Sequence, residues 1–325
     1  MTAPSPRSAA PAEALVERFR EALARLWPEG GKLGLAVSGG PDSLAMLLLA
    51  QAAIPGRFEV ATVDHGLRPE AADECAMVAR VCAERGIPCE VLKVKVSPGN
   101  LQARARDARY SGLLKWAERR AITAVATAHH ADDQAETLLM RLNRASGVAG
   151  LAGVRERTVL DFPTAEVMLV RPLLEFRRRE LGEVVLAGGL SAVTDPSNLD
   201  DQFDRARLRK ALANVDWLDT LALARSAGHL AEAEDALQEF TALQWSSLVR
   251  PEGDSLRFYP LTQRLMRFRL IERIIRELGG KPRGTEIATL LDRLDAGSPA
   301  NLSGVLATVE APEWVFRREP PRRSG

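Results

Sequence analysis

Predicted buried strands and helices alternate through residues 32–144, and this alternation constrains the fold more than any other feature of the chain. Strands are predicted at 32–37, 58–63, 88–96 and 122–127, with a further strand at 167–170. Helices are predicted at 12–26, 44–53, 70–85, 101–119 and 132–144, with a further helix at 178–187. Strands that alternate with helices form a parallel sheet covered by helices on both faces. The sequence therefore predicts an α/β fold for this part of the chain.

The pattern changes near residue 215, where long helical segments replace the alternation. Helices are predicted at 221–249, 261–278 and 286–294, followed by strands within 302–316. A chain of 325 residues is long enough for two domains. We expect a disordered tail at 1–11, an α/β domain at 12–215, a smaller, mainly helical domain at 216–319 and a tail at 320–325.

Composition and charge narrow the class of protein. The formal net charge is +1, so no global excess of positive charge indicates a nucleic-acid partner. No apolar run is long enough for a membrane span, and the N-terminus does not read as a signal peptide. Cys75, Cys82 and Cys89 form no CxxC pair, which argues against a disulfide framework or a zinc site. We expect a soluble cytosolic protein.

A glycine turn follows the first predicted strand, at Ser38-Gly39-Gly40-Pro41-Asp42-Ser43. Glycines let backbone N–H groups approach anionic oxygens closely, and the helix that follows directs its positive end at the same point. The two serine hydroxyls add further donors. The segment lacks the Gly-Lys ending of a Walker loop. It predicts a phosphate-binding site, with a tight strand–helix turn as the plain structural alternative.

Polar clusters follow two other predicted strands, at Asp64–Arg68 and Thr127–Asp133. The carboxyl ends of parallel strands share one edge of a sheet, and ligands bind at that edge. Asp132 and Glu136 are spaced to lie on one helix face. Carboxylates at a helix start also stabilise the helix by themselves. For His129 and His130 two interpretations stay open, contact with a nucleotide or proton transfer on one side and a structural histidine pair on the other. We expect these groups to converge with the glycine turn.

The six residues of the glycine turn resemble the SGGxDS loop of the PP-loop N-type ATP pyrophosphatases. That family cleaves ATP between the α and β phosphates, and the resemblance implies an adenine nucleotide alpha hydrolase-like fold. Further segments resemble the tRNA isoleucine-lysidine synthetases within it, closely over about residues 30–210. They are VDHGLR at 63–68, ARDARY at 105–110, TAHHADDQAET at 127–137, RPLL at 171–174 and DPSN at 195–198.

The resemblance implies a ligase reaction. ATP adenylates the carbonyl oxygen of the wobble cytidine in the CAU anticodon of tRNA-Ile, and L-lysine then displaces AMP through its ε-amino group to give lysidine. The implied cofactors are ATP and Mg²⁺, the implied partners are tRNA-Ile and L-lysine, and no membrane is involved. The resemblance makes residues 12–215 the catalytic domain and 216–319 the tRNA-binding domain. Oligomeric state stays open, with a homodimer as one option.

The resemblance also implies roles for single residues. Asp133 and Glu136 are the lysine-binding candidates, and Arg109 is a candidate for stabilising phosphate or adenylate charge. Asp42 is associated with the magnesium and phosphate site, and it completes the catalytic set with these three. The ATP-binding residues are Ser38, Gly39, Gly40, Pro41, Asp42 and Ser43.

Arginines at two places are candidates for contacts to tRNA phosphates. Arg205, Arg207 and Arg209 resemble the FxRNxxR segment of the family, but Ala206 stands where asparagine is usual. Five more arginines accompany an apolar stripe on the predicted helix 261–278. A run of charge is often only a solvated helix face, so that interpretation stays open for both segments.

Two alternative functions remain open. A PP-loop tRNA thiolase is similar in its loop, although thiolases generally add cysteines, commonly as CxxC, which this chain lacks. A nucleotide-binding regulator without catalysis is the other alternative. The intact Asp42, Asp133 and Glu136 argue against it.

Overall fold

The computed structural model describes residues 10–67, 70–162, 165–192, 204–212 and 215–319. It divides the chain into two compact units, Met1–Ala231 and Glu232–Gly325, and the division falls inside the long helix α9 (Thr220–Leu248). Several residues and segments considered in the sequence lie outside the described residues, namely Arg68, the turn 195–198, Phe203, most of the N-terminal tail and the tail 320–325.

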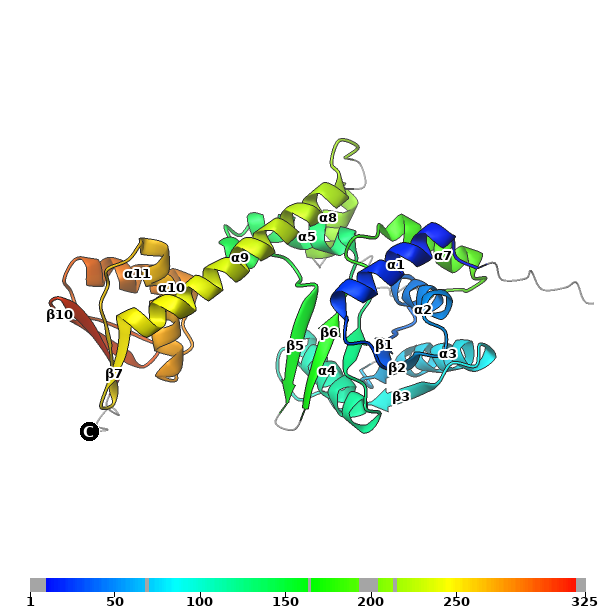
Figure 1. The fold of residues 1–325 in the computed structure, drawn as a ribbon, viewed down its shortest axis with the longest axis horizontal. Helices are drawn as coiled ribbons and strands as arrows, with labels where there is room; N and C mark the ends of the chain where they lie inside the picture. The colour runs from blue at the N-terminus through cyan, green and yellow to red at the C-terminus, as the bar shows by residue number, and fades with distance from the viewer. Residues whose placement is uncertain (1–9, 68–69, 163–164, 193–203, 213–214, 320–325) are drawn as a thin grey trace, which may run out of the picture. The chain divides into compact units, whose positions relative to one another are not determined.

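The first unit is built on a six-stranded sheet in the order β3-β2-β1-β4-β6-β5 (Figure 1). Its strands are β1 (Leu33–Ala36), β2 (Phe58–Asp64), β3 (Cys89–Lys93), β4 (Ala124–Ala126), β5 (Arg157–Phe162) and β6 (Ala165–Val170). All neighbours pair in parallel except β5 and β6, so the predicted parallel sheet is confirmed with one antiparallel edge. The sequence interpretation took 145–165 for a connection and missed β5. Only two residues separate β5 from β6, and so short a connection joins antiparallel strands.

Helices cover both faces of this sheet. The helices of this unit that precede α9 are α1 (Glu13–Leu26), α2 (Pro41–Ala53), α3 (Glu70–Glu84), α4 (Leu101–Arg119), α5 (Ala131–Leu142), α6 (Val148–Leu151), α7 (Arg178–Ala187) and α8 (Asp204–Leu212). One apolar core joins α1, α2, α3 and α7 to one face, and a second joins α4 to the other. Leu33 and Leu35 lie in the first core, whereas Gly34 between them faces Trp116 of α4. A Cβ at Gly34 would lie 2.6 Å from the Trp116 ring, so the close packing of α4 requires a glycine there.

The strand order reverses at β1, and this reversal positions the site. From β1 the chain moves outward through β2 to β3, and β4 then returns to pair with the other side of β1. In open α/β sheets, ligands bind outside the carboxyl ends of the strands at such a reversal. Residues 38–43 follow β1 and the pair His129–His130 follows β4, so adjacent strands deliver both predicted clusters to this point.

The second unit combines helices with a five-stranded antiparallel sheet in the order β7-β8-β11-β10-β9. Its further elements are β7 (Val249–Glu252), β8 (Ser255–Phe258), α10 (Arg264–Glu277), α11 (Gly284–Asp295), β9 (Ala300–Leu302), β10 (Val305–Glu310) and β11 (Glu313–Arg318). The three predicted helices and the C-terminal strands are present. The sequence interpretation missed β7 and β8, because the β7 segment Val-Arg-Pro-Glu is mostly exposed and shows no apolar alternation.

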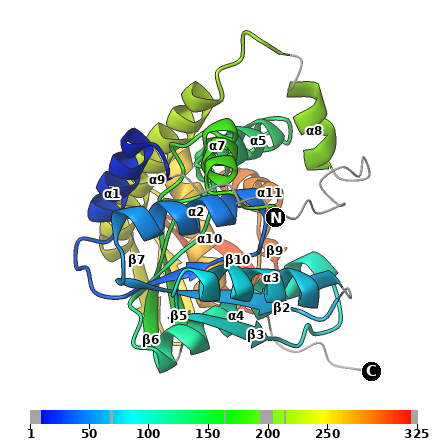
Figure 2. The ribbon, with the colours of Figure 1, turned by 90° about the vertical axis from the view of Figure 1, so that its right-hand side faces the viewer.

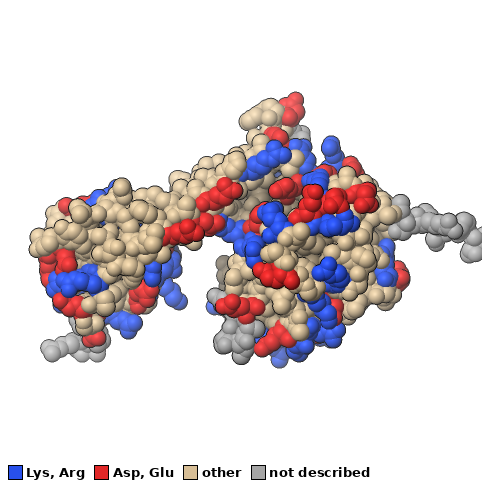
Figure 3. All heavy atoms as spheres, viewed as in Figure 1, with Lys and Arg blue, Asp and Glu red and all other residues tan. Residues whose placement is uncertain are grey.

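None of the helices in the described part of the chain combines the length and apolarity that crossing a membrane requires. Lys and Arg side chains are interspersed with Asp and Glu over the face drawn in Figure 3. This mixture agrees with the formal net charge of +1 and leaves any recognition of an anionic partner to local groups.

Candidate active site

The glycine turn forms a tight loop between β1 and α2. Gly39 has φ +89°, and a Cβ there would lie 3.0 Å from the side chain of Met77, so both its conformation and its surroundings favour glycine. The hydroxyl of Ser43 accepts a hydrogen bond from the Ser38 N–H (3.2 Å) and donates one to the Gly40 carbonyl oxygen (2.9 Å). Gly40 caps α2, and Pro41 and Asp42 open its first turn. The first N–H groups of a helix have no partner within it, so this turn can bind an anion.

His130 joins the loop to the start of α5. Its side chain is fully buried, and its Nε2 lies 3.4 Å from a carboxylate oxygen of Asp42 and 3.6 Å from one of Asp133. Its Nδ1 lies 3.6 Å from a carboxylate oxygen of Asp132. Three acidic side chains from α2 and α5 therefore surround one imidazole.

Electrostatics couple these groups. Burial acts to lower the pKa of His130, but the neighbouring Asp42 and the charge of Asp133 outweigh it, and the pKa is raised. Burial acts to raise the pKa of Asp42, but His130 and the charges of Arg178 and Arg209 outweigh it, and the pKa is lowered. The cluster thus favours an ionised Asp42 beside the loop.

The first turn of α5 also has structural contacts. The carboxylate of Asp133 accepts a hydrogen bond from the His130 backbone N–H (3.2 Å), which is a capping contact. The carboxylate of Asp132 accepts one from the Arg178 N–H at the start of α7 (2.8 Å). Both carboxylates keep a second oxygen, and their side chains remain 20% and 26% exposed, so capping and ligand binding are compatible here.

Glu136, one turn further along α5, is enclosed by arginines. Its side chain is 3% exposed. Both of its oxygens accept hydrogen bonds from Arg209 of α8, at 2.9 Å and 3.1 Å. Arg178 of α7 donates a third at 3.3 Å, and Arg205 lies 3.8 Å away. The carboxylate is therefore buried with its negative charge already matched.

A second cluster, of positive charge, contains Arg109. Arg109 is exposed to solvent, and its guanidinium lies over the Tyr110 ring. The surrounding protein atoms still desolvate the guanidinium enough to lower its pKa, the charge of Arg106 acts in the same direction, and Tyr110 opposes the shift. The Nδ1 of His129 and the hydroxyl of Thr127 share a hydrogen bond (3.1 Å). His129 lies between the two clusters. Its pKa falls to about 4, chiefly through burial and further through Arg171, Arg106 and Arg109, while Asp133 opposes the shift. His129 is therefore neutral near pH 7 and Arg109 lies among other cations.

The donor set fits a magnesium ion that a nucleotide helps to hold. Among the described residues no group of three or more His, Cys, Asp or Glu side chains is arranged to bind a metal by itself. Mg²⁺ beside phosphates takes only one or two carboxylates from the protein. Oδ1 of Asp42 is buried and lacks a hydrogen-bond partner within the described structure, which suits such a ligand.

The structure brings most of the sequence candidates together and separates others. Asp42, Asp133 and Glu136 lie in one network, and Arg205 and Arg209 join it from α8, whereas Arg207 pairs with the exposed Asp204 of the same helix. The helix α8 lies near α5 in the ribbon of Figure 2. Sequence reasoning missed Arg178. An arginine that begins a helix carries no local signal of such a contact, because its partner Glu136 is 42 residues away in the chain.

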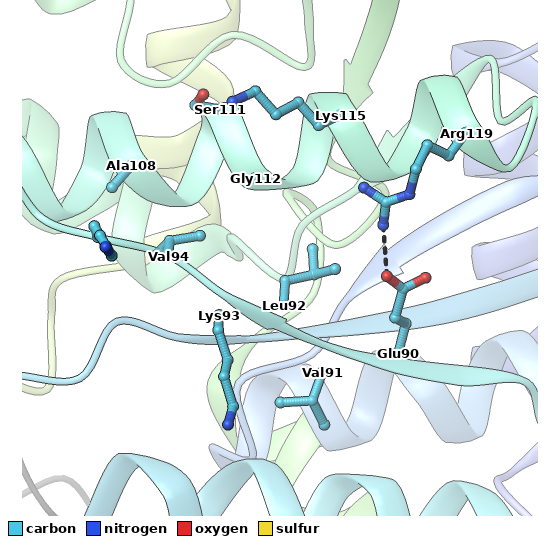
Figure 4. Close-up of a pocket in the computed structure, with 11 residues that line it drawn as sticks. Glu90, Val91, Leu92, Lys93, Val94, Ala108, Ser111, Gly112, Lys115 and Arg119 are labelled. Atoms are coloured by element: carbon cyan, nitrogen blue, oxygen red, sulfur yellow. Dashed lines mark hydrogen bonds and ion pairs between the residues drawn. The ribbon is translucent and has the colours of Figure 1, made fainter.

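A recess outside this site lies between β3 and α4, with a volume of about 490 Å³ (Figure 4). Its acidic residue Glu90 pairs with Arg119 at 2.5 Å. Lys93, Lys95 and Lys115 also line it, and within the described residues none of these lysines has a carboxylate within 4.0 Å. The recess is basic, but β3 is two strands from β1, so it is separate from the cluster around His130 and Glu136.

Comparisons with known proteins agree with this geometry. The sequence profile of the PP-loop domain matches residues 11–216. A tRNA(Ile)-lysidine synthase of Novosphingobium aromaticivorans is 46% identical over 310 residues, which cover 94% of each chain. One of Zymomonas mobilis is 38% identical over 313 residues, again 94% of each chain.

Among solved structures, the U34-tRNA thiolase NcsA of Methanococcus maripaludis, solved with its [4Fe-4S] cluster, aligns with a TM-score of 0.55 and 17% identity. The alignment covers 68% of this chain and 80% of the thiolase, and at that identity it supports the fold alone. Two relatives align over nearly the whole chain, and the fold and the loop at the strand reversal agree with them. The chain therefore belongs to the tRNA(Ile)-lysidine synthase family of PP-loop proteins.

Proposed function

We propose that the chain ligates L-lysine to the wobble cytidine of the CAU anticodon of tRNA-Ile, at the expense of ATP. The observation that carries the proposal is the glycine loop beside the α5 carboxylates, in a chain 46% identical to a tRNA(Ile)-lysidine synthase over nearly its whole length. Such an enzyme acts in the cytoplasm. We keep residues 12–215 as the catalytic domain and 216–319 as the tRNA-binding domain.

The loop Ser38-Gly39-Gly40-Pro41-Asp42-Ser43 binds the triphosphate in this proposal. Backbone N–H groups at the start of α2 and the serine hydroxyls donate to phosphate oxygens, and the helix end adds favourable charge. Asp42 would hold Mg²⁺, which neutralises charge on the phosphates when bound. The cytidine carbonyl oxygen attacks the α-phosphorus, the bond to the β-phosphate oxygen breaks, and pyrophosphate leaves from the loop.

The lysine step needs carboxylates for an ammonium ion. Asp133 and Glu136 bind and orient lysine. The ε-amino group must lose a proton before it attacks the ring carbon, and AMP departs with the former carbonyl oxygen. Arg109 stabilises the negative charge that develops on the adenylate. The proton lost by the ε-amino group passes to water, because a pKa of about 4 makes the neutral imidazole of His129 a weak base.

Contacts to tRNA are assigned to arginines of α8. Arg205, Arg207 and Arg209 lie on one short helix that packs against α5, and phosphate contacts position an RNA without reading its sequence. A homodimer stays a prediction, which sedimentation of the free enzyme tests.

The placement of the cysteines bears on the thiolase alternative. Cys75 and Cys82 are buried on α3, and Cys89 begins β3, at the opposite end of that strand from the carboxyl edge of the sheet. A persulfide carrier needs a thiol at the site of reaction, so this arrangement favours lysine ligation.

Incubation of the purified protein with ATP, labelled lysine and a tRNA-Ile transcript tests the proposal. We expect one lysine per tRNA with equal amounts of AMP and pyrophosphate, and loss of incorporation in Asp42→Ala and Glu136→Ala. Activity with a sulfur donor in place of lysine would instead establish the thiolase.

A further inference from the structure

Trp217 lies on the connection between α8 and α9, and its indole ring is almost entirely in solvent. The residue is 80% exposed, the highest value among the large apolar residues that the structure describes. Three of the other four tryptophans are buried, and Arg273 lies over the ring of the fourth, Trp245. Tryptophan is a highly buried residue on average, because an exposed ring forgoes a large hydrophobic gain. The exposure of Trp217 therefore indicates a partner outside the free chain.

The turn that carries Trp217 is held on both sides. After it, the carboxylate of Asp219 accepts a hydrogen bond from the Leu221 N–H (2.9 Å) at the start of α9 and pairs with the guanidinium of Arg177. Before it, the Val215 N–H donates to a carbonyl oxygen of α8 (3.1 Å). The chain is thus fixed two residues before and two residues after Trp217, so a defined turn presents the ring to solvent.

This turn lies beside the start of α7, which also contacts the proposed lysine-binding carboxylates. Arg177 precedes Arg178, and Arg178 donates a hydrogen bond to Glu136 at 3.3 Å. Two residues of extended chain span about 7 Å at most, so Trp217 lies close to the pair of Arg177 and Asp219. The exposed ring is therefore near the groups that we assign to the reaction.

The surroundings of Trp217 favour RNA over a protein as its partner. Arginines occupy 177–179 in succession, and the side chain of Arg179 is 80% exposed. Cations beside an aromatic ring suit single-stranded RNA, whose phosphates meet the cations while its bases stack on the ring. Asp216 is exposed next to Trp217 and repels phosphate, so a base rather than the backbone faces the ring. A stable protein interface buries about 800 Å² on each partner, more than the roughly 250 Å² of one tryptophan.

We propose that Trp217 stacks on an unpaired base of the anticodon loop and so holds that loop beside α5. The inference rests on the proposed function, which it deepens by adding an RNA-binding residue. Every base has a π face, so the stack fixes the position of the loop without reading its sequence. Trp217 then contributes to the affinity for tRNA and leaves the chemical steps to other groups.

The test is binding of an RNA stem-loop with a CAU anticodon to the full-length protein, at one salt concentration. We expect Trp217→Ala to weaken binding roughly tenfold or more, as the loss of one base–aromatic stack does. Trp217→Phe should keep most of the affinity, because a phenyl ring still stacks. Leu186→Ala is the matched control, since Leu186 of α7 is 78% exposed in the same unit, and we expect wild-type affinity there.

Two further measurements separate stacking from other roles of Trp217. A duplex of the same stem without the loop should bind Trp217→Ala and the wild type equally, and the salt dependence of binding should be the same in both, because no phosphate contact is lost. An unchanged affinity of Trp217→Ala for the stem-loop, or an equal loss for stem-loop and duplex, overturns the inference. So does a change in sedimentation of the free protein, which would place Trp217 in a protein interface.

Lysine incorporation separates the inference from the proposed function. At saturating tRNA-Ile, Trp217→Ala should incorporate lysine at the wild-type rate, but it should need roughly tenfold more tRNA to reach half that rate. If the wild type ligates lysine and Trp217→Ala matches it at every tRNA concentration, the inference alone fails. If the wild type ligates no lysine while the stem-loop affinities follow as expected, the RNA contact stands and the proposed reaction fails.

Discussion

Arginines serve different purposes in the two units. Around Glu136 in the first unit, arginines from α7 and α8 converge on one buried carboxylate. In the second unit the arginines of α10 each have a carboxylate within 4.0 Å on the same or a neighbouring helix. These are Arg264 with Asp292, Arg267 with Asp295, Arg269 with Glu234, Arg273 with Glu277 and Arg276 with Glu272.

This difference distinguishes charged residues that stabilise the fold from charged residues that form a site. The α10 arginines border an apolar face whose residues Leu270, Ile271 and Ile274 are fully buried, so packing decides where they lie. In the first unit, α2, α5, α7 and α8 bring charged groups together from distant parts of the chain. Such convergence at a strand reversal indicates ligand binding.

The largest expected effect is on the rate of pyrophosphate release, which we assign to the first unit. Replacing Asp42 by Asn keeps the size of the side chain but removes its charge beside the loop, and we expect pyrophosphate release in a single turnover to fall roughly 10³-fold. Glu183→Gln, at an exposed carboxylate on α7, is the control and should leave the rate unchanged. A near-normal rate in Asp42→Asn would mean that the cluster is structural, like the pairs of the second unit.

The next effect concerns stability of the second unit. Arg269 and Glu234 are 14% and 5% exposed and pair through two hydrogen bonds. Glu234→Gln leaves a buried arginine without its carboxylate and should lower the free energy of unfolding by about 3 kcal/mol, measured in urea. Replacing both residues by Met should recover most of that loss. No recovery would show that this pair, too, does more than maintain the fold.

Acid should destabilise the first unit through His129. Its folded pKa of about 4 lies below the unfolded value, so the folded state favours the neutral ring, and stability present above pH 6.5 is lost as pH falls towards 4. Between pH 7 and pH 5 this amounts to about 2 kcal/mol. Urea unfolding at both pH values, compared with His129→Gln, checks the size: an equal pH dependence in the variant would remove His129 as the cause.

The smallest effect is expected at the surface of α10. Arg276 and Glu272 form an exposed pair at 2.8 Å, one turn apart. Arg276→Gln should change the free energy of unfolding by less than about 0.5 kcal/mol. A weakened affinity for tRNA in the same variant would give this arginine a role in RNA binding beyond its ion pair.

Most of the first unit could be predicted because its pattern is local. The strand ending at Ala36, the helix after Pro41 and the carboxylates of α5 follow from apolar periodicity and from the rule that sites form at strand ends. The strand β7 could not be predicted, because its exposed residues and its proline carry no strand signal. A resemblance to a known family added the roles of single residues.

The pairing of Glu136 could not be predicted from sequence. Arg209 is 73 residues away from it in the chain, and the spacing of Arg205, Arg207 and Arg209 fits a solvated helix face equally well. The hydrogen bonds of Arg205 and Arg209 to α5 show which arginines face inward. The two helices α5 and α8 are labelled close together in Figure 1. The prediction of phosphate contacts for these three residues therefore stays a prediction, now with a defined starting contact for Arg209.

A structure of the protein with Mg²⁺ and a non-hydrolysable α,β-methylene analogue of ATP tests the central claim most directly. The account predicts the β- and γ-phosphates against the N–H groups that begin α2, with Asp42 beside the magnesium ion and the α-phosphate open towards the α5 carboxylates. Phosphates bound elsewhere, with the glycine turn after β1 empty, would contradict it.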